Sequence, residues 1–232
     1  MPIDAISLDL DDTLWPIAPT IEAADRALAE WMAAHAPRAA AALPIPAMRA
    51  LRDQVFAEHP ELGHDFTTLR MITLRRALLP HGYSEDAVAG AFEAFFSARQ
   101  RVELYADVQI ALERLAARWP LVSLTNGNAC LTRIGLKPWF RAEISSRQHG
   151  KAKPDPSIFH AACQAAGSTP ARTLHIGDHP EQDVLGALRA GMPAVWLNRH
   201  GQAWTHGEAP TRVCRDLHEV VDWLEQVLAT AA

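Results

Sequence analysis

The chain has 232 residues, enough for one large domain or for a core domain with a smaller inserted one. Its residues are 49% hydrophobic, its formal net charge is −5 at pH 7, and its pI is near 6.1. This composition supports a buried core and argues against a general nucleic-acid-binding surface, which needs clustered basic residues, but it leaves a small anionic substrate open.

The first predicted element is a buried strand over residues 3–9, and no convincing strand follows before residue 102. In between, apolar residues recur three and four positions apart among Ala, Leu, Glu, Arg and Gln, which predicts helices over residues 20–36, 47–58, 66–80 and 85–101. Prolines and glycines predict breaks between these helices, and the alanines 39–41 are placed in a loop. Ser84 is the expected N-cap of the last helix.

From residue 107 onward, short apolar strands alternate with helices of about ten residues, as in βαβ units. The predicted elements are helix 107–118, strand 120–125, helix 129–135, strand 141–145, helix 155–166, strand 172–177, helix 181–190 and strand 193–197. The predicted fold class is therefore α/β, with a Rossmann-like, doubly wound parallel sheet in a core domain of residues 1–15 and 104–232. An all-helical domain, residues 16–103, is inserted after the first strand.

Three cysteines, Cys130, Cys163 and Cys214, lie far apart and form no CxxC pair, so we expect free thiols in a reducing compartment. The chain does not open with a secretory signal pattern, and no apolar run reaches the ~18 residues of a membrane span. We therefore expect a cytoplasmic protein without membrane or nucleic-acid partners. The sequence leaves the oligomeric state open.

Acidic residues crowd the end of the first predicted strand, in the stretch LDLDDTL. Asp9 and Asp11 are two residues apart and would point to the same side of an extended chain. Two unit charges ~4 Å apart repel by about 4 kcal/mol at an effective dielectric constant of about 20. A hard divalent cation such as Mg²⁺ would offset this repulsion, and a loop with helix-capping Asp residues is the alternative.

Polar residues also follow other predicted strands, and doubly wound sheets bind ligands at that end of their strands. In SLTNGN, the Thr125 hydroxyl and the Asn126 amide could bind a phosphate oxygen, although Asn-Gly is also a common turn. In GKAKPDP, Lys153 could neutralise phosphate charge, with Lys151 as its rival.

The last of these strands ends in GDHPEQD, where Asp178 could bind a metal beside Asp9 and Asp11. Asp183 follows at the start of a helix. Its pattern fits a metal ligand and an orienting or helix-charge role equally.

Together, the strand-end residues resemble the haloacid dehalogenase superfamily of aspartate-nucleophile phosphatases. DLDDTL is similar to its first motif, Thr125 to its second, Lys153 in GKAKPDPSIF to its third, and GDHPEQD to its fourth. The helical insert stands where the family carries its C1-type cap. Within the family, WPLVSLTNGN, HGKAKPDP, LHIGDHPEQDVLGALRAGM and the cap stretch HDFTTLR look most like bacterial phosphatases of FMN and of the phosphoribitylaminouracil intermediate of riboflavin synthesis.

The resemblance implies Mg²⁺-dependent hydrolysis of a small-molecule phosphate monoester. Asp9 would be the nucleophile that forms an aspartyl-phosphate, and Asp11 the general acid and base. Mg²⁺ would be held by Asp9, the backbone carbonyl of Asp11, Asp178 and, if it ligates, Asp183. The phosphoryl oxygens would be bound by Thr125, Asn126 and Lys153.

Thr13 is expected to brace the turn after the first strand, and Asp12 is given no chemical role. Arg70 is the candidate for substrate contact in the cap, with a solvated helix charge as the alternative. On the same fold, the alternative reactions are haloacid dehalogenation, which needs neither an acid at position 11 nor Mg²⁺, and a phosphomutase, which shares all four motifs. A non-catalytic binding module is the alternative outside enzymes.

Overall fold

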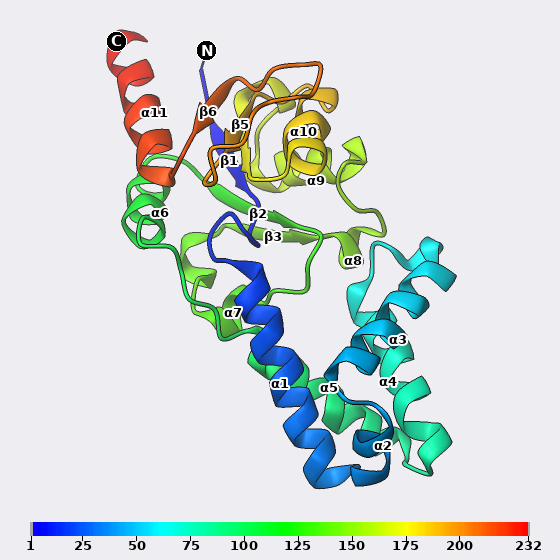
Figure 1. The fold of residues 1–232 in the computed structure, drawn as a ribbon. Coiled ribbons are helices and arrows are strands. Elements are labelled where there is room, and N and C mark those ends of the chain that lie inside the picture. The colour runs from blue at the N-terminus through cyan, green and yellow to red at the C-terminus, as the bar shows by residue number, and fades with distance from the viewer. Residues whose placement is uncertain (1, 232) are drawn as a thin grey trace. The chain divides into compact units, whose positions relative to one another are not determined.

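The computed structural model describes residues 2–231, which divide into two compact units (Figure 1). The core unit comprises the residues up to Pro16, Leu104–Gly127 and the residues from Leu131 onward. The cap unit comprises Ile17–Glu103 together with Asn128–Cys130. That the helical unit acts as a cap stays a prediction.

Parallel strands form the sheet of the core unit, in the order β3-β2-β1-β4-β5-β6. Their bounds are β1 Ala5–Leu8, β2 Leu121–Thr125, β3 Ala142–Ser145, β4 Thr173–Gly177, β5 Ala194–Leu197 and β6 Arg212–Cys214. The predicted α/β class with a parallel sheet is confirmed. β1, β2, β4 and β5 are buried along their whole length, which is why they read as apolar runs without polar alternation.

The strand order reverses at β1, which fixes the place of the ligand crevice. From β1 the sheet extends through β2 to β3 on one side, and through β4 to β5 and β6 on the other. In open doubly wound sheets, ligands bind beyond the carboxyl ends of the strands where the order reverses. Asp9 continues β1 and donates its N–H to the carbonyl of Ile176 in β4 at 2.9 Å, so the chains leaving β1 and β4 start side by side.

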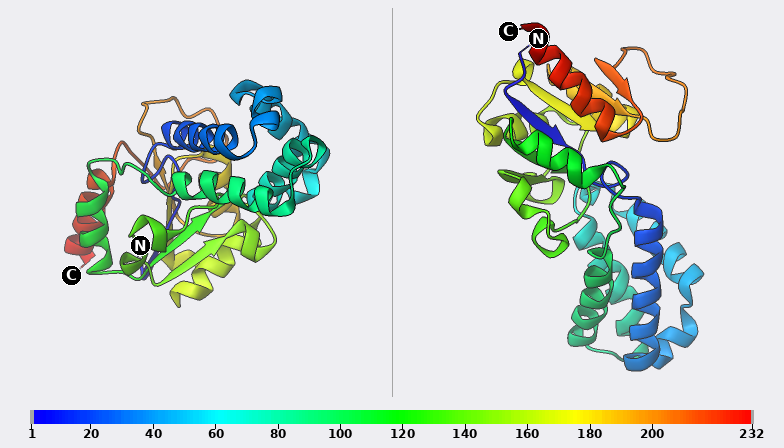
Figure 2. Two further views of the ribbon diagram at one scale, coloured as in Figure 1. Left: turned by 90° about the horizontal axis from the view of Figure 1, so that it is seen from below. Right: turned by 90° about the vertical axis from the view of Figure 1, so that its left-hand side faces the viewer.

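Helices cover the sheet of the core unit. α9, Pro156–Ala166, packs against β1, β2 and β3, and α10, Gly186–Arg189, packs against α9. α6, Val108–Ala116, and α11, Leu217–Ala231, lie side by side (Figure 2). The short helices α7, Leu131–Ile134, and α8, Ser146–His149, follow β2 and β3. Phe159, Val184 and Trp196 belong to the apolar cluster that joins α9 to the sheet.

β6 and α11 of the core unit were not predicted, because the predicted elements end at residue 197. β6 is a short edge strand with two exposed residues, so it lacks the apolar run of the inner strands. α11 buries Leu217, Val220, Val221 and Leu224 at helical spacing. The predicted helix 181–190 is instead a π-helical stretch, Pro180–Leu185, followed by α10.

The cap unit is all helical, and the predicted helices are all present with ends shifted by at most three residues. The bounds are α1 Ile17–His35, α2 Pro37–Ala42, α3 Ile45–Glu58, α4 Phe66–Leu78 and α5 Glu85–Arg99, with 3₁₀ turns at Pro60–Leu62 and Leu79–His81. Ser84 occupies the N-cap position of α5, but its side chain makes no capping hydrogen bond.

The loop predicted around the alanines 39–41 was wrong, because these residues lie in α2. Pro37 opens this helix, and proline is well tolerated in the first turn, where its missing N–H has no partner to lose. Across residues 2–231, no helix combines the length and the apolar character that crossing a membrane requires.

Candidate active site

A buried lysine and two aspartates form the centre of the site at the end of β1. Lys153 Nζ donates to Asp9 Oδ1 at 2.5 Å and to Asp183 Oδ1 at 2.6 Å, and all three side chains are at least nine-tenths buried. Burial alone would lower the pKa of Lys153, but the attraction of Asp183 and Asp9 and the hydrogen bonds to them raise it above its usual value. Lys153 is therefore a fixed positive charge inside the core unit.

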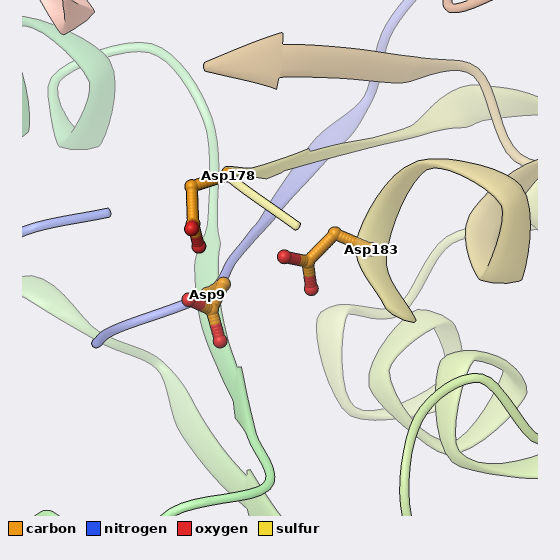
Figure 3. A group of neighbouring side chains, drawn as sticks. All are labelled: Asp9, Asp178 and Asp183. Carbon is orange, nitrogen blue, oxygen red and sulfur yellow. The ribbon is translucent and has the colours of Figure 1, made fainter. Parts of the chain in front are cut away.

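Three carboxylates, those of Asp9, Asp178 and Asp183, converge at the ends of β1 and β4, as Figure 3 shows. Oxygens of Asp9, Asp178 and Asp183 lie within 4.8 Å of one another. Burial raises the pKa of Asp9 to about 7, with Lys153 opposing and Asp183 and Asp11 adding to the shift. Burial, Asp9 and Asp183 raise the pKa of Asp178 to about 8. The raised pKa values show that the site disfavours three carboxylate charges together, and a dication such as Mg²⁺, which prefers hard oxygen donors, would favour their ionised forms.

Asp183 is anchored by the protein on both of its oxygens. Oδ1 accepts from Lys153 and lies 3.3 Å from His175 Nε2, and Oδ2 accepts from the His179 N–H at 2.9 Å. Burial would raise the pKa of Asp183, but Lys153 and His175 hold it below its usual range. These contacts favour the orienting role over direct metal ligation, which stays a prediction.

Two residues of β4, Gly177 and His175, lie next to the Asp183 carboxylate. A Cβ atom on Gly177 would lie 2.3 Å from Asp183 Cγ, so only glycine allows the carboxylate to approach the strand. The His175 ring is buried, and burial lowers its pKa, which keeps it neutral. Because the Asp183 carboxylate only accepts, Nε2 carries the proton and Nδ1 accepts from Ser7 Oγ at 3.1 Å.

A tight turn after β1 positions Asp11. Asp12 adopts a left-handed backbone with φ 59°, which Asp tolerates better than most residues, and its N–H donates to the Trp15 carbonyl at 2.8 Å. The Trp15 indole donates to Asp11 Oδ1 at 2.8 Å. The Asp11 carboxylate is not one of the three clustered at the candidate metal site, and its predicted metal contact was through its backbone carbonyl. Thr13 Oγ1 lies 3.4 Å from Asp178 Oδ1, a contact that joins this turn to the end of β4.

Asn126, in the stretch after β2, binds the backbone of Lys153 through its side chain. The Asn126 carboxamide donates to the Lys153 carbonyl at 3.0 Å and accepts from its N–H at 2.8 Å, and it also donates to Gln182 Oε1 at 3.0 Å. A phosphate contact of Asn126 would therefore use its backbone N–H, and it stays a prediction. Thr125 is buried, and its Oγ1 accepts from the Gly127 N–H at 2.9 Å, which leaves its hydroxyl proton to donate.

Two further candidates from the sequence, Lys151 and Arg70, lie outside this cluster of carboxylates. Lys151 pairs with Asp155 at 3.1 Å and is 62% exposed, whereas Lys153 is buried beside Asp9 and Asp183; phosphate binding by Lys153 stays a prediction. Arg70 lies in α4 of the cap unit and is buried, which excludes the alternative of a solvated helix charge.

Arg199, after β5, was missed by the sequence analysis. Its guanidinium makes two hydrogen bonds to Asp107, at 2.9 and 3.1 Å, and a third to the carbonyl of Thr13 at 2.8 Å. Its face lies 4.0 Å from the centre of the Tyr105 ring, and Asp107 also accepts from the Leu217 N–H. Arg199 thus ties the turn after β1 to the starts of α6 and α11. The available signal was the pair of polar residues, Asn198 and Arg199, that follows an apolar strand.

We expect Arg199→Ala to destabilise the protein by about 3–5 kcal/mol, since it leaves the Asp107 carboxylate buried without its cation. The exposed pair of Arg215 and Glu219 offers the matched control, since its arginine side chain is 81% exposed. Arg215→Ala should cost less than about 1 kcal/mol. Urea unfolding of both variants measures the difference, and equal losses would show that the Arg199 pair adds nothing beyond a surface ion pair.

A model of the haloacid dehalogenase-like hydrolases matches residues 3–191. The match covers well over half of the chain and includes the candidate residues on all four strand ends. The chain belongs to the haloacid dehalogenase-like hydrolases. It is therefore an enzyme of this family, and the predicted superfamily is confirmed.

Relatives in the family match between 63% and 99% of this chain. The 5-amino-6-(5-phospho-D-ribitylamino)uracil phosphatase YigB of Escherichia coli is 34% identical over 199 residues, 84% of this chain and 83% of its own. The phosphoserine phosphatase of Thermus thermophilus is 35% identical over 152 residues, 63% of this chain and 61% of its own. A structure described as a 2-haloacid dehalogenase from Pseudomonas syringae is 36% identical with a TM-score of 0.89, covering 99% of this chain and 100% of that one.

Proposed function

We propose that this hydrolase is a Mg²⁺-dependent phosphatase that cleaves a small-molecule phosphate monoester through an aspartyl-phosphate on Asp9. The observation that carries the proposal is the cluster of Asp9, Asp178 and Asp183 around Lys153 at the reversal of the strand order. Such a cluster suits a dication, whose positive charge and that of Lys153 would offset the negative charges of the carboxylates and of a bound phosphoryl group. The named phosphatases among the relatives support the same reading.

In the first step, an oxygen of Asp9 attacks phosphorus, and the bond from phosphorus to the leaving oxygen breaks. Lys153 already occupies Oδ1, so Oδ2 is the oxygen that would attack. Asp11, held by the Trp15 indole, would give its proton to the leaving oxygen. Lys153 and the Thr125 hydroxyl would bind the phosphoryl oxygens and stabilise the charge of the transition state.

In the second step, water attacks the phosphorus of the aspartyl-phosphate, and Asp11 takes the proton that the water loses. Inorganic phosphate leaves, and the Asp9 carboxylate and the protonated Asp11 are regenerated. Asp11 is thus acid and then base, a cycle that leaves no net proton on the enzyme.

Mg²⁺ would be held by the carboxylates of Asp9 and Asp178 and by the backbone carbonyl of Asp11. When bound, it would neutralise negative charge shared by the carboxylates and the phosphoryl group. Asp183 would keep Lys153 directed at Asp9, because its oxygens are already engaged within the protein.

Removal of Mg²⁺ should abolish phosphate release from p-nitrophenyl phosphate, and added Mg²⁺ should restore it. Asp178→Asn should raise the Mg²⁺ concentration for half-maximal activity by at least about 10-fold. It should also remove the rise in thermal midpoint that Mg²⁺ gives the wild type, a readout independent of turnover. Asp222→Asn, at an exposed aspartate paired with Arg114, is the control. Hydrolysis that resists EDTA would contradict the proposed metal site.

The candidate substrates are FMN and the phosphoribitylaminouracil intermediate of riboflavin synthesis, and the likeness to YigB over most of both chains supports the second of them. A panel of these two, sugar phosphates and nucleotides, read by release of inorganic phosphate, ranks the substrates. A phosphomutase would move the phosphoryl group within its substrate without net release, so the same panel separates the two reactions.

Haloacid dehalogenation is the second candidate, because the structure described as a 2-haloacid dehalogenase covers 99% of this chain at 36% identity. It would use Asp9 to displace halide from carbon, with no task for an acid at position 11 or for a metal. Chloride release from 2-chloropropionate in EDTA, with no phosphate release from the panel in Mg²⁺, would replace the proposed phosphatase by this reaction.

A further inference from the structure

Trp196 is a buried tryptophan whose indole reaches the end of β4. It lies in β5, is 2% exposed, and belongs to the apolar cluster that joins α9 to the sheet. Its Nε1–H donates to the backbone carbonyl of Asp178 at 2.7 Å. A buried tryptophan normally finds a partner for its N–H, and here the partner is the peptide that carries a candidate metal ligand.

Asp178 is the first residue after β4. The strand ends at Gly177, which is paired with Trp196 in the neighbouring strand β5. The chain then leaves the sheet for the π-helical stretch that begins at Pro180. The indole therefore binds the main chain at the point where the regular pairing of β4 has ended.

The Asp178 carboxylate is directed at Asp9, as Figure 3 shows. Its oxygens belong to the three-carboxylate cluster, in which the donor atoms lie within 4.8 Å of one another. The Thr13 hydroxyl lies 3.4 Å from Asp178 Oδ1, a long distance for a hydrogen bond between oxygens. The direction of the carboxylate therefore depends largely on the peptide that carries it, which the shorter bond from Trp196 fixes.

The Trp196 indole is itself held in place by the loop that follows β5. The Trp204 ring packs against it edge to face, with ring centres 5.1 Å apart and planes inclined by 63°. Asn198 closes the start of this loop, since its side chain donates to the Gln202 carbonyl at 2.8 Å and accepts from the Gln202 N–H at 2.9 Å. All of these residues belong to the core unit, so the donor is preorganised within one compact body.

Asp178 and Trp196 both line a cavity of about 160 Å³ in the core unit. Water occupies about 30 Å³ per molecule in the liquid, so this polar cavity has room for several waters. If the indole donor were removed, such water would hydrate the Asp178 carbonyl, and folding should survive. A water molecule can turn, however, so it would satisfy the carbonyl without fixing its direction.

We propose that Trp196 is a positioning residue of the candidate metal site. Its N–H fixes the Asp178 peptide and thereby directs at Asp9 the carboxylate that would hold Mg²⁺. This assignment rests on the proposed function. Because Trp196 acts only through Asp178, its loss should weaken Mg²⁺ binding and leave the chemical step intact once Mg²⁺ is saturating.

Trp196→Phe keeps an aromatic ring in β5 and removes the donor. The Mg²⁺ concentration that gives half of the rise in thermal midpoint, measured without substrate, should increase by about 10- to 100-fold. Phosphate release from p-nitrophenyl phosphate should need the same higher concentration and return toward the wild-type rate at saturation. Trp119→Phe is the matched control, since this buried indole donates to the Ile3 carbonyl at 3.0 Å, beside the amino ends of β1 and β2. It should leave the Mg²⁺ dependence unchanged.

A second replacement guards against poor folding of Trp196→Phe. Exchange of Trp196 for β-(3-benzothienyl)alanine keeps the bicyclic shape and puts sulfur in place of the N–H, and it should weaken Mg²⁺ binding in the same way. Wild-type Mg²⁺ dependence in a folded variant without the N–H, or an equal change in Trp119→Phe, would overturn the role of Trp196 and leave the phosphatase standing. A wild type that Mg²⁺ neither stabilises nor activates would overturn the proposed metal site and, with it, this role.

Discussion

Asp9→Asn is expected to lower hydrolysis of p-nitrophenyl phosphate by at least about a thousandfold, because a neutral amide cannot form the aspartyl-phosphate. Folding should survive the change. Lys153 keeps Asp183 as a partner at 2.6 Å. Burial raises the pKa of Asp178 most, and the loss of the Asp9 carboxylate relieves the repulsion that adds to this shift. The thermal midpoint in EDTA should therefore stay close to that of the wild type.

Acid-quenched single turnover with a ³²P-labelled ester gives the direct readout of the Asp9 variant. The wild type should retain alkali-labile label on the protein, and Asp9→Asn should retain none. Asp4→Asn, just before β1, is the matched control, because Asp4 is 45% exposed and pairs with Arg172. Turnover near the wild-type rate in Asp9→Asn would remove Asp9 from the role of nucleophile.

The sheet and the ends of its inner strands could be predicted because the signals are local. Each inner strand is a short apolar run, and the residues that follow β1, β2 and β4 are polar. The rule that ligands bind at the carboxyl ends of doubly wound strands then brings Asp9, Thr125 and Asp178 to one edge without any knowledge of their contacts.

The hydrogen bonds within the site could not be predicted, because they join residues that lie far apart in the sequence. Asn126 pairs with the backbone of Lys153, which no spacing in the sequence indicates. The hydrogen bonds of Asp183 to Lys153 and the His179 N–H favour its orienting role, which stays a prediction, and no spacing in the sequence indicates these contacts. They form because a buried carboxylate must find partners within the protein.

The burial of Arg70 in the cap unit could not be predicted from the sequence either. A helical arginine is exposed in most proteins, and the sequence gives no sign that this one loses its solvent. The structure buries it against Phe95 beside an aspartate that another arginine already binds. α2 was missed for a different reason, since a proline that breaks one helix can also begin the next.

The second large effect is expected for Lys153→Met, which should abolish activity and also lower stability by about 3–5 kcal/mol at neutral pH. Without the lysine, Asp9 and Asp183 would be buried with no cation between them. Lys151→Met is the control, since that side chain is 62% exposed and pairs at the surface. Urea unfolding in EDTA and phosphate release measure the two effects.

The pH dependence of the Lys153→Met loss has a definite sign. In the wild type, Lys153 holds the pKa of Asp183 below its usual value, so the carboxylate contributes stability above its unfolded pKa and loses that contribution as pH falls through its folded pKa. In the variant, burial is no longer opposed by the lysine, and protonation of the carboxylates favours the folded state. The gap in stability between wild type and variant should therefore narrow as pH falls from 8 toward 5.

A double variant separates charge from packing. Lys153→Met with Asp183→Asn removes one positive and one negative charge and keeps similar side-chain volumes. It should recover part of the lost stability, because fewer buried carboxylates remain unpaired, but none of the activity, because Asp9 would still lack the cation beside it. Stability losses that simply add would mean that Lys153 contributes packing alone, and the view of the site as a balanced cluster of charges would then fail.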